Sequence, residues 1–238
     1  MGVSYSYKSI VTDGLVFYVD PANPRSYISG SLDVNSMIDT TTTGSLLSDL
    51  GFSEQNSGTF EFDGIDDDIF FTPNSDDSLF VPTGPFSVSS WFKLTYSILR
   101  FQYFFIVGTG GGHDYYIRSN DDGKVELSVR TIIGSPYYTK LSSDDTLTLN
   151  KWTNVVAVAD GSNMYLYIDG VQAATPISGT YLKVSTSTRE PSMGAFYYTG
   201  APYAGFLNGL MSSTSTYNRA LTSQEIQQNY NALKDRFI

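Results

Sequence analysis

Apolar and polar residues alternate through much of this chain, and that period of two predicts β-strands. In residues 86–94 the apolar side chains at alternate positions fall on one face of an extended chain, and residues 60–62 and 164–168 show the same alternation. Successive side chains of a strand point to opposite faces of a sheet, so each stretch turns one apolar face toward a core. The dominant pattern therefore predicts a protein built mostly from sheets.

Short polar turns separate the predicted strands. The sequences DDG at 121–123, DGSN at 160–163 and DG at 169–170 each join two strand-like stretches. Asp, Asn and Gly accept the backbone conformations that tight turns require. Many short strands joined by such turns are typical of an antiparallel sandwich or barrel.

The C-terminal segment follows a different period and predicts one helix over about residues 222–236. Thr222 is a favourable N-cap residue, and Glu225, three positions later, completes a capping box. Apolar residues then recur at helical spacing: Ile226, Tyr230, Leu233 and Phe237. One face of this helix is therefore apolar, and we expect it to dock on a sheet.

Four segments, in order along the chain, resemble laminin-G-like, concanavalin A-like domains. They are FEFDGIDDDIFF (60–71), FSVSSWFKL (86–94), KWTNVVAVADGSNMYLYIDGVQAA (151–174) and NGLMSSTSTYNRALTSQEI (208–226). The resemblance implies an all-β fold, a two-sheet antiparallel jelly-roll sandwich with a short C-terminal α-helix. Because no stretch has the composition of a linker, we expect residues 1–238 to form a single domain.

The composition narrows the possible partners. The chain has a net charge of −10 and a pI near 4.4, and its 14 Lys and Arg residues are spread thinly. Nucleic acids and anionic lipids are bound by clustered Lys and Arg, so we expect neither as a partner. No stretch approaches the ~20 consecutive apolar residues that span a membrane, and the N-terminus lacks the pattern of a signal peptide.

The resemblance also implies a calcium site, since related domains often bind this ion with carboxylates and carbonyls from neighbouring loops. Asp20, Asp39 and Asp63 occupy acidic positions of the family pattern. Ser212, in contrast, stands where the pattern commonly carries an acid, which counts against a metal. We therefore expect no required cofactor, with calcium as the candidate ion. The alternative is that these acids cap turns and keep the surface solvated.

Three acids are spaced much like those of laminarinase-type glycoside hydrolases, which share the fold. Glu61 and Asp63 would share one face of a strand, as retaining catalysis with carboxyl groups ~5 Å apart requires. However, Gly64 interrupts the strand and Asp66 falls in a turn. We therefore expect no catalytic residue and no enzyme activity.

Aromatic residues are abundant, and pairs of tyrosines lie near predicted loops. An exposed tyrosine offers an apolar ring and a hydroxyl, which suits sugars and protein interfaces equally, although many rings of a sandwich belong to its core. The candidate ligand-binding residues are Tyr115, Tyr116, Tyr137, Tyr138, Tyr197, Tyr198 and Tyr203. His113 is the single histidine and is expected to be a polar loop residue.

Two functions remain open. The opening GLVFYVDPANPRSY (14–27) resembles the version of this domain found in bacteriophage virion proteins. That resemblance implies a non-enzymatic virion structural protein, either a capsid decoration or a fibre or adhesin module. We expect such a protein to assemble in the host cytoplasm as a homo-oligomer, with a trimer favoured, and to bind other virion proteins and host glycans. The alternative is a stand-alone calcium-dependent lectin, with a glycoside hydrolase as the less favoured form.

Overall fold

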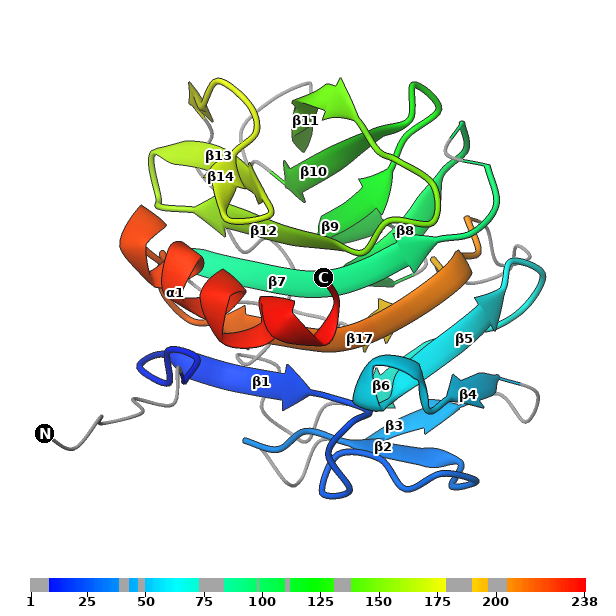
Figure 1. Cartoon of the computed structure of the whole chain (residues 1–238). Helices are drawn as coiled ribbons and strands as arrows, with labels where there is room; N and C mark the ends of the chain where they lie inside the picture. The colour runs from blue at the N-terminus through cyan, green and yellow to red at the C-terminus, as the bar shows by residue number, and fades with distance from the viewer. Residues whose placement is uncertain are drawn as a thin grey trace, which may run out of the picture.

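Two antiparallel sheets and one C-terminal helix make up the described fold (Figure 1). The structure is a computed structural model, and it describes residues 9–38, 43–46, 50–72, 84–97, 99–109, 112–130, 138–178, 190–196 and 205–238. Its architecture confirms the predicted two-sheet antiparallel sandwich with a short terminal helix.

The first sheet has the strand order β14-β13-β12-β7-β17-β5-β4, and β1 and β15 pair with β17 and β13. Every pairing is antiparallel. Its strands are β1 (Leu15–Val19), β4 (Gly51–Ser53), β5 (Thr59–Asp63), β7 (Phe86–Leu94), β12 (Thr153–Ala159), β13 (Asn163–Ile168), β14 (Val171–Gln172), β15 (Ile177–Ser178) and β17 (Asn208–Tyr217).

The second sheet has the strand order β11-β10-β9-β8-β16-β6-β3-β2 and is also antiparallel. Its strands are β2 (Asp33–Asn35), β3 (Thr43–Leu46), β6 (Ile69–Thr72), β8 (Gln102–Thr109), β9 (Gly112–Ser119), β10 (Lys124–Arg130), β11 (Tyr138–Thr146) and β16 (Glu190–Met193). A short 3₁₀ turn, η1 (Gln55–Ser57), precedes β5. The predicted turns at 121–123, 160–163 and 169–170 are confirmed, because they join β9 to β10, β12 to β13 and β13 to β14.

Alternate residues of the strands meet between the sheets, as the period-two pattern predicts. Phe60 and Phe62 of β5 are buried in the core, whereas Glu61 between them is exposed. Phe92 of β7 and Phe104 of β8 stack with ring centroids 3.7 Å apart, so the two sheets are in direct contact there. Burial of such apolar surface is the main favourable contribution to folding.

The predicted C-terminal helix is confirmed and lies across the outer face of the first sheet (Figure 1). Helix α1 spans Ser223–Leu233 and continues as a 3₁₀ turn, η3 (Lys234–Arg236). The capping box forms as predicted, since the hydroxyl of Thr222 accepts from the N–H of Glu225, whose carboxylate accepts from the N–H of Thr222. The helices of the described ranges are all too short or too polar to reach across a lipid bilayer.

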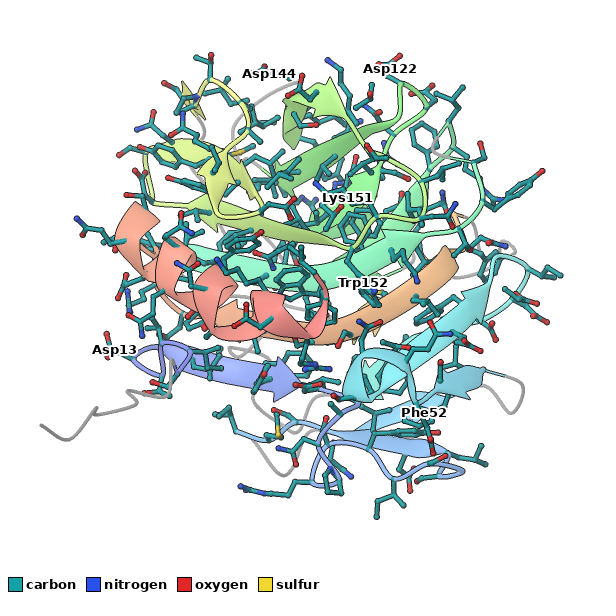
Figure 2. The ribbon with its side chains drawn as sticks, in the orientation of Figure 1. Asp13, Phe52, Asp122, Asp144, Lys151 and Trp152 are labelled. Atoms are coloured by element: carbon teal, nitrogen blue, oxygen red, sulfur yellow. The ribbon has the colours of Figure 1, made fainter. Side chains whose placement is uncertain are left out.

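Aromatic rings hold the helix on the sheet. Trp91 of β7 is 1% exposed and stacks on both Tyr230 and Phe237, with ring centroids 5.6 and 4.4 Å away. Trp152 lies beside the end of the helix (Figure 2), 4.7 Å from the ring of Phe237. The outer face of the first sheet is therefore a second apolar layer.

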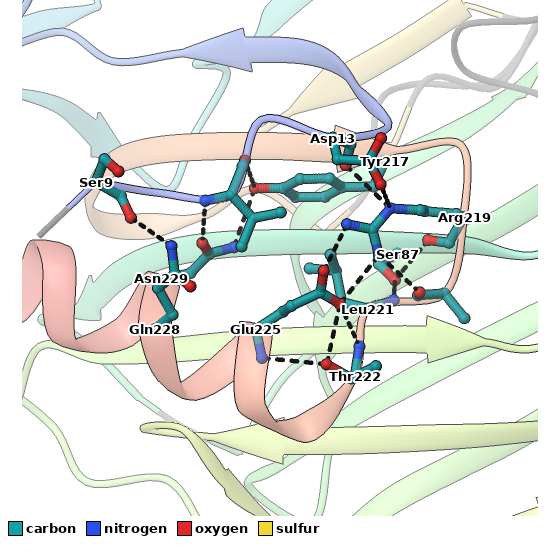
Figure 3. Close-up of polar contacts among 12 residues, drawn as sticks. Ser9, Asp13, Ser87, Tyr217, Arg219, Leu221, Thr222, Glu225, Gln228 and Asn229 are labelled. Carbon is teal, nitrogen blue, oxygen red and sulfur yellow. Dashed lines mark hydrogen bonds and ion pairs between the residues drawn. The ribbon is translucent and has the colours of Figure 1, made fainter.

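Asn229 fastens the helix to both the sheet and the N-terminal segment (Figure 3). Its side-chain oxygen accepts from the N–H of Val11 at 2.7 Å, and its amide donates to the hydroxyl of Tyr217 at 3.0 Å. The hydroxyl of Tyr217 donates in turn to the carbonyl of Val11 at 3.1 Å. This closed ring of hydrogen bonds satisfies buried polar groups from three distant parts of the chain.

We expect the pairing of Arg219 with Glu225 to make stability depend on acid pH. Both guanidinium NH groups of Arg219 reach this carboxylate, at 2.7 and 3.0 Å (Figure 3). Arg219 and the hydrogen bonds from Thr222 lower the pKa of Glu225 from 4.5 to about 2. Because the folded-state pKa is depressed, the stabilisation is complete above 4.5 and is lost as the pH falls through about 2. Melting curves recorded from neutral to acid pH should therefore fall less steeply for Glu225→Gln than for the wild type.

An exposed carboxylate provides the control for that experiment. Glu54→Gln removes one acid from the surface near η1 and should follow the wild-type pH profile. Parallel profiles for Glu225→Gln and the wild type would contradict the assignment.

Candidate functional site

The outer face of the second sheet carries a group of aromatic and charged side chains, which we call the aromatic face. It is formed by residues of β8, β9, β10 and β11, and register shifts in the pairing of β8 with β9 place Tyr103 and Ile106, and likewise His113 and Tyr116, three positions apart. Its members are Tyr103, Ile106, His113, Tyr116, Arg118, Glu126, Ser128 and Tyr138.

An ion pair between Arg118 and Glu126 lies at the centre of the aromatic face. Arg118 donates from Nε and NH2 to Oε1 of Glu126, at 3.0 and 2.7 Å, and both residues are 8% exposed. The hydroxyl of Tyr116 donates to the same oxygen at 2.6 Å, and Arg118 donates to the hydroxyl of Tyr103 at 2.9 Å. Burial raises the pKa of both tyrosines, which keeps Tyr116 protonated as a donor. A buried pair held by this many hydrogen bonds has a fixed geometry.

Aromatic rings surround this ion pair. His113 stacks on Tyr138, with ring centroids 4.0 Å apart and planes 15° apart, and lies 4.4 Å from Tyr116. The guanidinium of Arg118 lies over the ring of Phe101, 3.9 Å from its centroid. Phe101 is 41% exposed, and the His113 and Tyr138 side chains are half-buried. Partly open rings beside fixed donors and acceptors suit a ligand with both apolar and hydroxyl surfaces.

The structure brings together two of the predicted tyrosines and separates a third. Tyr116 and Tyr138 both contact His113 on the aromatic face. Tyr115 lies in the core instead, 1% exposed and 4.6 Å from the ring of Phe86, so it is not available to a ligand. Neighbouring residues of a strand point to opposite faces, so Tyr115 and Tyr116 belong to different clusters on the two sides of the second sheet. Tyr137, Tyr197, Tyr198 and Tyr203 lie outside the described residues.

Other members of the site were not predicted from the sequence as binding residues. His113 belongs to β9 and is not the loop residue that was expected. Arg118 and Glu126 lie directly opposite each other in the pairing of β9 with β10. The sequence did show one charged residue in each of two neighbouring apolar strands, which could have indicated an ion pair. Whether the two residues meet depends on the register between the strands, and the sequence does not show that register.

Of the acids of the predicted calcium site, the two that the structure describes, Asp20 and Asp63, do not fall in one group of ligand oxygens. The carboxylate of Asp20 forms an ion pair with Arg236 at 2.7 Å, so it does not fit a metal ligand here. Asp63 instead groups with Asp66 and Asp67, whose ligand oxygens all lie within 4.8 Å of one another. Asp39 lies outside the described residues.

The group at Asp63 is also a hydrogen-bonded turn. Oδ2 of Asp67 accepts from the N–H of Asp63 at 2.8 Å, and Oδ1 of Asp63 accepts from the N–H of Ile65 at 2.7 Å. Burial, with a further contribution from Asp67, raises the pKa of the neighbouring Asp68 to about 6. These carboxylates have the chemistry that a hard cation prefers, and those of Asp63 and Asp67 also hold the turn through these two hydrogen bonds.

The acids with hydrolase-like spacing lie away from the aromatic face. Glu61 and Asp63 are exposed on β5, and Glu61 pairs in register with Leu210 on the helix side of the first sheet. Asp66 follows in the turn after β5. The aromatic rings and the candidate catalytic acids therefore occupy opposite sides of the sandwich.

A cavity of about 290 Å³ opens near the start of β12. Hydroxyl, amide and charged groups supply much of its lining, among them Thr146, Thr153, Lys151 and Gln172, and no aromatic residue is among the described residues that line it. Lys151, labelled in Figure 2, is held at 2.8 Å by Asp169. None of the described residues that line this cavity belongs to the aromatic face.

Solved structures with a similar fold include both binding domains and a glycosidase. The receptor-binding domain of a botulinum neurotoxin C/D mosaic serotype has a TM-score of 0.71 and 14% identity over 93% of this chain and 52% of that one. Domain 4 of the arabinanase AbnA from Geobacillus stearothermophilus, in complex with arabinotriose, has a TM-score of 0.64 and 18% identity over 91% and 98%. The sialidase of Trypanosoma rangeli has a TM-score of 0.66 and 14% identity over 95% and 34%. At these identities the likeness shows the fold alone, and this chain spans about half the length of the neurotoxin domain.

The family itself is shown by sequence. No curated protein matches the chain. A family model described as the concanavalin A-like lectin/glucanases superfamily matches residues 62–227, which is most of the chain. The single domain expected over residues 1–238 stays a prediction. The chain thus belongs to the concanavalin A-like lectin/glucanases superfamily.

Proposed function

We propose that this protein is a non-catalytic binding module that recognises glycans through its aromatic face. The observation that carries the proposal is the half-buried stack of His113 on Tyr138, which lies next to the buried ring of Tyr116 and the buried pair of Arg118 and Glu126. Rings of this kind stack on the apolar face of a sugar, and fixed polar groups beside them select the positions of its hydroxyls.

The ion pair leaves hydrogen-bonding capacity on this face. All of the hydrogen bonds that Glu126 accepts from Arg118 and Tyr116 end on Oε1, and none from a described residue ends on Oε2. Oε2 is therefore an acceptor for a ligand hydroxyl. Lys140 adds a donor, since its Nζ lies 3.6 Å from Oε1 and its side chain is 48% exposed.

The comparisons support the class of ligand. One neighbour of similar fold is named as a receptor-binding domain, and another is a domain in complex with arabinotriose. The non-catalytic part of the proposal rests on geometry: the paired acids on β5 face away from the aromatic rings, and Asp63 is engaged in its own turn.

Replacing Tyr138 or His113 by alanine should weaken glycan binding about tenfold or more. Each substitution removes one of two stacked rings, and a tenfold loss corresponds to ~1.4 kcal/mol, within the range of a stacking contact. A glycan array that includes arabinotriose would identify the ligand, and calorimetry would then measure the dissociation constant for wild type and variants.

Tyr165→Ala is the matched control, because this half-buried tyrosine lies in β13 of the opposite sheet. It should bind glycans as the wild type does. Equal affinity of Tyr138→Ala, His113→Ala and the wild type would refute the site, and a wild-type protein that binds no glycan on the array would refute the function.

The virion role is a second proposal, supported by the resemblance of residues 14–27 to the bacteriophage version of the domain. We propose that the module is mounted on a phage particle as a decoration or fibre component, with other virion proteins as partners and a trimer as its assembly. Native mass spectrometry of the purified protein measures that assembly directly, and a monomer at all concentrations would contradict it.

Calcium stays a prediction. The turn with Asp63, Asp66 and Asp67 offers suitable oxygens, whereas Asp20 is taken by Arg236. The glycan site proposed here uses none of these acids, because it lies on the other sheet. Glycan binding is therefore expected to be the same in calcium and in chelator.

A further inference from the structure

The guanidinium of Arg236 lies among four oxygen atoms, which we call the oxygen cage. NH1 donates to Oδ2 of Asp20 at 2.7 Å, and Nε donates to the carbonyl of Asn56 at 3.0 Å. NH2 donates to Oγ of Ser212 at 2.9 Å and to the carbonyl of Gly58 at 3.4 Å. One carboxylate, two carbonyls and one hydroxyl thus converge on a single cation.

Three separate segments of the chain supply the oxygen cage, and part of its backbone has an unusual conformation. Asp20 follows β1, Ser212 belongs to β17, and Asn56 lies in η1. Asn56 has a left-handed backbone with φ of 53°, and Gly58 has φ of 133°. A Cβ at Gly58 would lie 2.8 Å from the carbonyl oxygen of Pro21, so this close approach requires glycine. Backbone held in these unusual conformations directs two carbonyls toward one point.

Oxygens of these types are the ligands of hard metal ions such as calcium. Asp20 is the one acidic side chain among the four oxygens, so the cage carries a charge of −1, which one guanidinium balances. A divalent ion in the same place would leave a surplus of one positive charge. We propose that Arg236 is a built-in cation that occupies this cage in place of a metal ion and makes the docking of the C-terminus independent of calcium.

The cage is connected to the aromatic contacts that hold the helix. Asn56 donates from its amide to the carbonyl of Arg236 and accepts from the indole N–H of Trp152 at 3.0 Å. Phe237, the next residue, packs on Trp152 and stacks on Trp91. Filling the cage with a side chain of the terminal segment therefore fixes the last turn of the helix against the sheet.

Two substitutions separate the charge of Arg236 from its shape. Arg236→Gln removes the charge and keeps much of the side-chain length, and it should lower the melting temperature by about 5–10 °C, because it leaves Asp20 buried without a counter-ion. Arg236→Lys keeps the charge with fewer donors and should melt between Arg236→Gln and the wild type. Equal melting of Arg236→Gln and the wild type would overturn the proposal.

A metal should replace the arginine once the charge of the cage is raised. In Arg236→Ala/Ser212→Asp the cage would carry −2, and we expect millimolar calcium to raise the melting temperature by several degrees more than it does for the wild type. Adding Asp20→Asn as a third change should abolish that gain, while the turn at Asp63, Asp66 and Asp67 stays intact in all variants. Tb³⁺ luminescence, sensitised by the neighbouring Tyr18, gives a second readout that does not depend on melting.

The outcomes distinguish a cation cage from an ordinary surface ion pair. A calcium-dependent gain in the double variant that Asp20→Asn removes supports the proposal. A double variant that responds to calcium no more than the wild type does, with no Tb³⁺ signal that depends on Asp20, overturns it.

Discussion

Replacing Trp91 by alanine is expected to lower the free energy of unfolding by about 3–5 kcal/mol. Its indole is 1% exposed and lies between β7 and the terminal helix. The ring stacks on Tyr230 with the planes 10° apart and on Phe237 with the planes 22° apart. Alanine would remove these contacts and leave a cavity, and both losses contribute to the cost. Urea unfolding followed by circular dichroism measures the change.

An exposed aromatic residue provides the matched control. Tyr96 is 63% exposed in the connection between β7 and β8, and Tyr96→Ala should change the free energy of unfolding by less than about 0.5 kcal/mol. A loss below about 1 kcal/mol for Trp91→Ala would show that the helix does not pack on the sheet as described.

Deleting residues 222–238 should have a larger effect and cause the protein to aggregate. The deletion removes every helix residue that covers Trp91, Trp152 and Leu210, and also removes Arg236 from Asp20. The uncovered face would then be a contiguous apolar patch next to an unpaired carboxylate. Size-exclusion chromatography with light scattering should find large oligomers or no soluble protein.

A minimal deletion tests whether the effect comes from the helix or from shortening the chain. Ile238 is 75% exposed, and removing it alone should leave the protein soluble with an unchanged melting temperature. A fully folded protein with the wild-type assembly state after deletion of 222–238 would show that the helix is dispensable and would also weaken the proposed role of Arg236.

The elements that the sequence predicted well are those whose signals are local. The capping box at Thr222 and Glu225 lies within one turn of helix, and it formed as expected. The turns at 121–123 and 160–163 join neighbouring strands, so their residues and their geometry are adjacent in the chain. Alternation placed Phe60 and Phe62 in the core for the same reason, since it depends on the strand alone.

The candidate site was harder to predict because it depends on register and on which face of the sheet each residue occupies. Tyr115 and Tyr116 were both candidate ligand-binding residues, but these consecutive residues of β9 lie on opposite faces of the sheet. Arg118 and Glu126 form a pair because the register of β9 with β10 places them opposite each other. The sequence of either strand alone does not predict that register. The four candidate tyrosines outside the described residues stay predictions.

The sequence by itself determined the fold class, the terminal helix and the apolar faces, because periodicity and capping act over a few residues. Only the tertiary structure decided which group each acidic side chain binds. Asp20 resembled a calcium ligand in sequence, yet its carboxylate binds Arg236, which lies 216 positions away. Contacts between residues so far apart in the chain depend on how the two sheets and the helix pack. No local sequence pattern predicts that packing, so the partner of a buried charge is known only from the folded chain.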